Sequence, residues 1–139
     1  MKKRIILPLL ILSFLMISVT ILADNTKYIG QNIDYQVGLD LPNVGWAYHD
    51  EEGNLKGFRG INLGLGYSQK TYFEPGLKEG KFNNFWGWGT VALIIPYGEI
   101  GTEYPFALQE NGSFWTVGGA LYVYFPIIPG ARIGVSYHF

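Results

Sequence analysis

Apolar and polar residues alternate along most of the chain beyond residue 27. In residues 28–41 one side of an extended chain is apolar apart from Gln31, and most of the other side is glycine, asparagine, aspartate or glutamine. Side chains of a strand point to opposite faces in turn, so this period of two predicts a β-strand. The period returns in residues 57–73, 82–95, 100–109, 114–125 and 131–139. No part of this region has a helical period, so the pattern predicts an all-β chain with six clear strands.

The segments between these runs have the composition of turns. They are rich in proline, glycine, asparagine or charge, and comprise residues 42–56, 74–81, 96–99, 110–113 and 126–130. In the first run Ile29, Ile33, Tyr35, Val37, Leu39 and Leu41 are expected on the outer face, and in the second Ile61, Leu63, Leu65 and Tyr67. The opposite faces hold small and hydrogen-bonding residues, which suit the interior of a narrow barrel.

The number of strands decides whether such a barrel can close. Eight strands are the usual minimum for a closed barrel in a membrane, and six would leave almost no interior. An open strand edge cannot be left unpaired in hydrocarbon, so closure is required there. We therefore expect about eight strands in a small up-and-down barrel, with residues 45–49 as one and another run divided where no turn signal marks it. The alternative is that another chain completes the barrel.

The last nine residues carry the most specific signal. Residues 131, 133, 135, 137 and 139 are all apolar and share one face of the terminal strand. A terminal Phe139, with Tyr137 two residues before it, resembles the C-terminal β-signal of small Gram-negative outer-membrane β-barrels. The resemblance implies a transmembrane barrel in the bacterial outer membrane, and an assembly signal for the barrel-assembly machinery at Ile133, Val135, Tyr137 and Phe139. It implies no specific family and no activity.

The direction of the final strand determines on which side of the membrane each turn is expected. If it runs toward the periplasm, residues 42–56, 96–99 and 126–130 are expected outside, and residues 74–81 and 110–113 inside. An even number of strands places both ends of the barrel on one side of the membrane. Closure pairs the terminal strand with residues 28–41.

The N-terminus predicts export. Lys2, Lys3 and Arg4 precede an almost wholly apolar segment, residues 5–22, and Ala23 offers a cleavage site. We expect a signal peptide over residues 1–23 and one barrel domain over residues 24–139. An uncleaved membrane helix is the alternative, because about 18 residues is the short end of a membrane span. No cysteine follows the apolar segment, so a lipoprotein is not expected.

Composition narrows the classes of partner. Residues 24–139 contain seven basic and eleven acidic residues, a net charge of −4, and this balance does not favour nucleic acid. They also contain all 19 glycines and all but one of the aromatic residues, which fits a barrel with aromatic girdles at the membrane interfaces. The expected girdle residues are Trp86, Trp88, Tyr97, Trp115, Phe125, Tyr137 and Phe139. An aromatic-lined ligand pocket is the alternative for the same residues.

Four charged residues lie on the polar faces of the predicted strands: Asp34, Asp40, Glu103 and Arg132. Because closure brings the first and last strands together, Arg132 is expected to meet Asp34 or Asp40 inside the barrel. The cluster is either a selectivity or gating element or an ion pair that neutralises the narrow interior.

The sequence offers no marked catalytic site. His49 and His138 could be combined with Ser136 or Ser68 and with Glu103 as a hydrolase, yet there is no GxSxG motif and no metal-ligand spacing. The two histidines are expected on opposite sides of the membrane. We therefore expect no catalytic residue, no cofactor and no metal.

Taken together, the pattern predicts a non-enzymatic outer-membrane barrel that is structural or surface-interacting and has at most a narrow pore. Its expected partners are outer-membrane lipid and the assembly machinery, and a homo-oligomer is left open. One alternative is a secreted or periplasmic barrel that binds a small apolar ligand, with its apolar faces inward. The other is a barrel enzyme that modifies lipid A.

Overall fold

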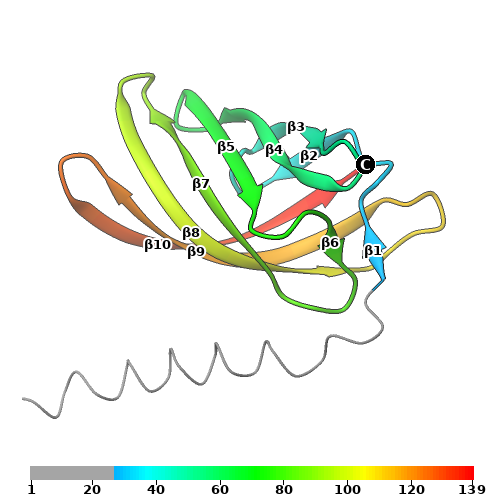
Figure 1. The fold of residues 1–139 in the computed structure, drawn as a ribbon. Coiled ribbons are helices and arrows are strands. Elements are labelled where there is room, and N and C mark those ends of the chain that lie inside the picture. Colours follow the sequence, from blue (N-terminus) through cyan, green and yellow to red (C-terminus); the bar gives the residue numbers. More distant parts are fainter. Residues whose placement is uncertain (1–26) are drawn as a thin grey trace, which may run out of the picture.

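The computed structural model describes residues 27–139, so the expected signal peptide and its cleavage at Ala23 lie outside the described residues. The strands are β1 (Tyr28–Ile29), β2 (Tyr35–Gly38), β3 (Val44–His49), β4 (Leu55–Asn62), β5 (Gly66–Tyr72), β6 (Leu77–Lys78), β7 (Asn83–Val91), β8 (Ile95–Phe106), β9 (Phe114–Tyr124) and β10 (Ile128–His138). Eight of them form a closed antiparallel barrel in the order β10-β2-β3-β4-β5-β7-β8-β9, and β1 pairs with β6 beside it (Figure 1). The predicted all-β, eight-stranded, up-and-down barrel is thus confirmed. Within residues 27–139 no helix has the length and apolar character to cross a membrane.

The terminal strand closes the barrel, as predicted. β10 pairs with β9 along its whole length and with β2 over three residue pairs, Ser136 with Gly38, Tyr137 with Val37 and His138 with Gln36. Phe139 extends this seam, because its carbonyl accepts hydrogen bonds from the main-chain N–H groups of Asp34 and Tyr35 at 3.1 and 2.8 Å. Its own N–H donates to the Tyr35 carbonyl at 3.0 Å.

The two strands that the pattern did not mark are now located. The first is β3, which includes residues 45–49 as expected. The second arises because the run 57–73 is divided into β4 and β5 by a turn at Leu63, Gly64 and Leu65. The turn is apolar, so neither its composition nor the alternation of residues 57–73 gave a sign of it.

Several predicted boundaries are wrong. Residues 28–41 form two strands separated by a turn at Gln31 and Asn32, so Ile29 and Ile33 are buried at the barrel's end and do not face outward. Residues 96–99 belong to β8, and the turn lies earlier, at residues 92–94. Residues 42–56 include β3 and the start of β4, and residues 74–81 contain β6. In residues 42–56, 74–81 and 96–99, pairing with a neighbouring strand overrode the local turn propensity of proline and glycine.

The barrel has two unlike ends. We call the end formed by residues 50–54, 73–82 and 107–113 the loop end; the C-terminus and β1 also lie there (Figure 1). The opposite end, formed by residues 39–43, 63–65, 92–94 and 125–127, is the turn end. His49 closes β3 at the loop end, the same end as His138, so the expectation that the two histidines lie on opposite sides is wrong.

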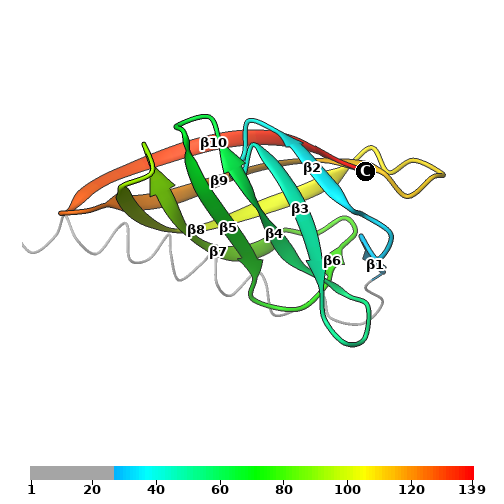
Figure 2. The same ribbon diagram turned by 90° about the horizontal axis from the view of Figure 1, so that it is seen from above.

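The wall of the barrel is taller on one side. Strands β8, β9 and β10 have 12, 11 and 11 residues, whereas β2 to β5 have four to eight. The hairpins β7–β8 and β9–β10 therefore extend well beyond the short strands (Figure 2). The turn end is a slanted rim rather than a level one.

Large apolar side chains point away from the barrel along most strands. Exposed examples on the strands are Val44, Trp46, Ile61, Trp86, Trp88, Ile100, Trp115, Leu121, Val123 and Ile133. Tyr97 was expected among the outward aromatics but is buried, because its position in β8 points inward. Inside the loop end a compact apolar layer contains Phe58, Phe85 and Phe114 together with Leu55, Leu77, Ile29 and Ile33.

Three residues of the turn end adopt a left-handed backbone conformation. Leu65, Ala92 and Leu93 have φ values of 57°, 50° and 65°. Glycine or asparagine normally occupies such positions, because a side chain there costs about 1–2 kcal/mol per residue. Ala92 and Leu93 are the central residues of a turn that the Ile94 N–H closes by donating to Val91 O at 3.3 Å. These turns therefore retain apolar side chains at a conformational cost.

Candidate functional site: the charged lumen

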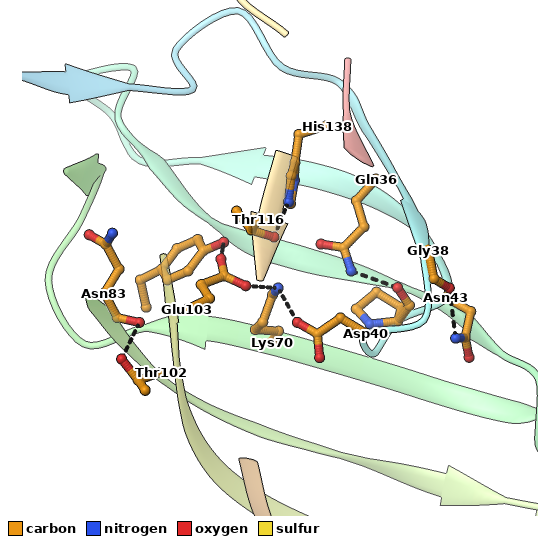
Figure 3. A network of polar contacts seen from close by, with 12 residues as sticks. Gln36, Gly38, Asp40, Asn43, Lys70, Asn83, Thr102, Glu103, Thr116 and His138 are labelled. Carbon is orange, nitrogen blue, oxygen red and sulfur yellow. Dashed lines mark hydrogen bonds and ion pairs between the residues drawn. The ribbon is translucent and has the colours of Figure 1, made fainter. Parts of the chain in front are cut away.

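Lys70 lies at the centre of the lumen and is completely buried. Its Nζ atom is 2.8 Å from Glu103 Oε2 and 3.2 Å from Asp40 Oδ2, so it joins β5, β8 and the β2–β3 turn (Figure 3). The same ammonium lies 5.2–5.7 Å from the ring centres of Phe58, Tyr72 and Phe85. Ion pairs and aromatic faces together compensate for its loss of water.

Arg132 forms the second cationic centre, one level closer to the turn end. Its Nη2 atom is 2.8 Å from both carboxylate oxygens of Glu99, and its Nε atom is 3.0 Å from Glu99 Oε2. Its Nη1 atom donates to Asp40. Asp40 therefore bridges Lys70 and Arg132, and the charges form one continuous network.

The network contains three carboxylates and two cations. Asp40, Glu99 and Glu103 are all nearly or fully buried, and a buried carboxylate is costly unless it is paired or hydrogen-bonded. The Tyr72 hydroxyl donates to Glu103 and supplies part of this compensation. Each charged group of the network is therefore paired with another member of it.

The sequence identified part of this network. Asp40, Glu103 and Arg132 lie in the lumen, whereas Asp34 is exposed at the loop end, where its N–H bonds to Phe139. Asp34 precedes β2, so the alternation assumed for residues 28–41 does not reach it.

Lys70 and Glu99 are the two charged members that sequence reasoning missed. Gly66, Ser68 and Lys70 are alternate residues of β5 and share its inward face. Extending the predicted inward series from Ser68 to the next alternate residue would therefore have identified Lys70. Glu99 was assigned to a turn, because Pro96 and Gly98 precede it, and no local signal places it in a strand.

A further polar cluster lies along the β2–β10 seam, beside the charges and the apolar layer. His138 Nε2 is 2.9 Å from the Thr116 hydroxyl, and its ring lies 4.8 Å from Phe114 and 5.0 Å from Phe58. Gln36 donates to Pro42 O at 2.6 Å. Within the described residues, Gln36 Oε1, Ser136 Oγ and His138 Nδ1 are buried without a hydrogen-bond partner. Gln36 and His138 are direct partners across the β2–β10 seam, so these atoms cluster where the barrel closes.

The suggested hydrolase constellation is not assembled in this arrangement. Glu103 bonds to Lys70 and Tyr72, and His138 bonds to Thr116, not to a serine. Ser68 pairs with Tyr97 and Asn62 on the other side of the lumen. His49 bonds to the carbonyl of Gly30 at 3.1 Å.

The loop end carries most of the charge outside the lumen. In the β3–β4 loop, the main-chain N–H of Asn54 donates to Asp50 at 2.9 Å and holds the pKa of this carboxyl below its ordinary value. Across the described part of the chain, no group of three or more histidine, cysteine, aspartate or glutamate residues is placed to hold a metal ion.

The fold and the site together define a class of architecture: an eight-stranded, up-and-down antiparallel barrel with a filled, ion-paired lumen. Comparison of the chain with protein-family models, with curated proteins and with solved structures finds no match.

Proposed function

We propose that this chain is a small integral outer-membrane β-barrel with a structural, non-enzymatic role and a closed lumen. The observation that carries the proposal is the reversal of polarity between the two faces of the barrel wall. Charged side chains are buried inside, and leucine, isoleucine, valine and tryptophan are exposed outside. A lipid-facing wall around a polar interior has this arrangement.

The same observation weighs against a soluble ligand-binding barrel. That alternative requires apolar faces inward, around a cavity for the ligand. Here the lumen contains Lys70, Glu103 and Asp40, and its apolar layer is packed with three phenylalanines at full burial. Exposed apolar patches larger than a few hundred Å² are rare on soluble monomers.

Aromatic contacts at the loop end support a membrane interface there. Trp115, Tyr137, Phe139 and Tyr35 form a continuous series on the outer face, with ring centres 5.0, 5.6 and 5.7 Å apart. Amphipathic aromatic rings concentrate where hydrocarbon meets water. We assign this series as a girdle on the periplasmic side, where a C-terminal β-signal would be exposed during assembly.

Fractionation tests the proposal. The full chain is expressed in a Gram-negative host, the outer membranes are washed with urea at alkaline pH, and boiled and unboiled samples are compared by gel electrophoresis. We expect the protein to remain in the washed membranes and to change mobility on boiling, because a closed barrel resists cold detergent. Recovery in the soluble periplasmic fraction, with the same mobility in both samples, would favour the ligand-binding alternative.

The enzymatic alternative has a separate test. Lipid A from the same cells is analysed by mass spectrometry, with cells that lack the chain as the control. We expect identical spectra. A changed lipid A that returns to normal in Ser136→Ala or His138→Ala would contradict the non-enzymatic part of the proposal.

A further inference from the structure

The surface of the turn end is far more apolar than the surface of the loop end. Its large exposed apolar side chains are Leu39, Leu63, Leu65, Leu93, Ile94, Phe125 and Ile127, each between 65% and 81% exposed. The one charged residue in these four turns is Asp40, which points into the lumen and pairs with Lys70 and Arg132. The loop end, by contrast, contains Asp50, Glu51, Glu52, Glu74, Lys78, Glu79, Lys81 and Glu110.

Several main-chain N–H groups of the turn end are bonded within the protein. The N–H of Ala92 donates to Gly64 O at 2.7 Å, which joins two separate turns. The N–H of Leu63 donates to the Asn43 side chain at 2.8 Å, which joins a third. The N–H of Leu65 and that of Phe125 donate to Asn62 O and Pro96 O at 3.2 and 3.0 Å. Turns in water do not require such links, whereas hydrocarbon penalises each unbonded group.

Strand lengths indicate how far each side of the wall can reach. A membrane-spanning strand needs about 9–11 residues, a length that β8, β9 and β10 have and β2 to β5 lack. On β4 the outward Arg59 is exposed, and only Ile61 faces outward between it and the turn. At about 3.3 Å per residue, Arg59 to Leu63 covers about 13 Å along the strand, roughly half of the ~25 Å apolar band of an outer-membrane barrel.

We propose that the turn end is a lipid-contacting surface, submerged among acyl chains, and that the barrel exposes aqueous loops only at its loop end. This inference rests on the proposed function, in which the outer wall contacts lipid. It adds that the short side of the wall does not cross the bilayer. A barrel of this kind is anchored in the membrane from the periplasmic side and displays no loops to the cell exterior.

Lipid fits this surface better than a second protein chain. A protein interface usually has an apolar centre bounded by a polar rim. Here the apolar surface has no such boundary: it continues from Ile127 and Leu93 along the outward side chains of Ile128, Ile95 and Leu121. The exposed side chains at this end are mainly aliphatic, whereas the aromatic series of Trp115, Tyr137, Phe139 and Tyr35 lies at the other end.

The chain contains no cysteine, so single cysteines provide a test. Leu63→Cys reports on the short side of the turn end and Ile127→Cys on its tall side, and Glu52→Cys and Glu110→Cys are matched exposed controls at the loop end. Each protein is labelled with bimane while unfolded, refolded into phosphatidylcholine vesicles, and checked for folding by its heat-dependent gel mobility. Fluorescence is then quenched by aqueous iodide or by nitroxide on the acyl chains of the lipid.

We expect the turn-end probes to be quenched by acyl-chain nitroxide and protected from iodide, and the loop-end probes to show the reverse. Iodide quenching that is equal at both ends would overturn the inference while leaving a membrane barrel intact. Protection of the turn-end probes from both quenchers would also overturn it, because a protein would then cover this surface. Failure of all four proteins to float with vesicles would instead contradict the proposed function.

Discussion

Among single residues, Lys70 determines the charge balance of the lumen. It contacts two of the three buried carboxylates directly, and it neighbours Arg132 through Asp40. Because the two cations share Asp40, neither can be removed without affecting the partners of the other. Lys70 also packs against three aromatic rings, so its long side chain contributes to packing as well as to charge.

We expect Lys70→Met to lower the free energy of unfolding by about 3–5 kcal/mol, because it leaves the buried Glu103 carboxylate without a cation and Asp40 with Arg132 alone. Urea unfolding in detergent micelles, followed by tryptophan fluorescence, measures the change. The exposed Lys56→Met is the matched control, with an effect within about 0.5 kcal/mol. Lys70→Met combined with Glu103→Gln is expected to recover part of the loss. Equal stability of Lys70→Met and the parent chain would argue against the ion pairs as a stabilising element.

At some positions of the barrel wall, only glycine fits against the main chain of the neighbouring strand. A Cβ atom built at Gly60 would lie 2.0 Å from Val44 O, which is closer than atoms approach. At Gly98, on the same wall, the nearest atom is 4.0 Å away. The tight curvature of a narrow barrel therefore requires glycine at the first position and not at the second.

Gly60→Ala is accordingly expected to destabilise the barrel by about 1–3 kcal/mol through overpacking. Gly98→Ala is expected to have little effect or to stabilise slightly, because alanine reduces the conformational freedom of the unfolded chain. Both are measured by the same urea unfolding. A larger loss in Gly98→Ala than in Gly60→Ala would contradict the register of β3 and β4.

Among the secondary-structure elements, the seam between β2 and β10, like the β2–β3 contact, is one of the two shortest in the barrel wall. It has three paired residues, whereas β9 and β10 share eleven. Phe139 adds three main-chain hydrogen bonds and a ring contact with Tyr35 at 5.7 Å. The terminal residue thus has a structural role in closure, separate from the recognition role that the β-signal resemblance implies.

Deleting Phe139 is expected to cost about 2–4 kcal/mol, at about 1 kcal/mol for each lost hydrogen bond and a similar amount for the ring contact. Phe139→Ala retains the main-chain bonds and is expected to lose only the ring contact. Refolding of both variants from urea into detergent measures closure without any assembly machinery. If both variants refold like the parent chain but fail to insert in cells, Phe139 acts only as a signal.

At the scale of the whole molecule, the lumen is filled from one end to the other. The apolar layer of Phe58, Phe85 and Phe114 lies at the loop end, the Lys70 and Arg132 networks follow, and Tyr97 with Ser68 lies closer to the turn end. An eight-stranded barrel has an interior just wide enough for side chains to fill. The narrow pore left open by the sequence pattern therefore has no continuous path through these layers.

We expect the purified protein to produce no stepwise conductance in planar lipid bilayers, because the fully buried Phe58, Lys70 and Phe114 side chains block the lumen. A known porin inserted under the same conditions provides the control for the measurement. Discrete openings of porin-like size would contradict the closed lumen and require the Lys70 layer to move.

The sequence alone determined the all-β class, the closure of the barrel by residues 131–139 and the outward face of most strands. These properties depend on the local period of two, which each segment carries by itself. Pairing between strands distant in sequence places Lys70 and Glu99 inside the lumen and Asp34 outside it. The same pairing positions the apolar turns at residues 63–65 and 92–94. Register and shear are properties of neighbouring strands rather than of one strand, so only the tertiary structure decided which charges meet and gave the barrel one charged end and one apolar end.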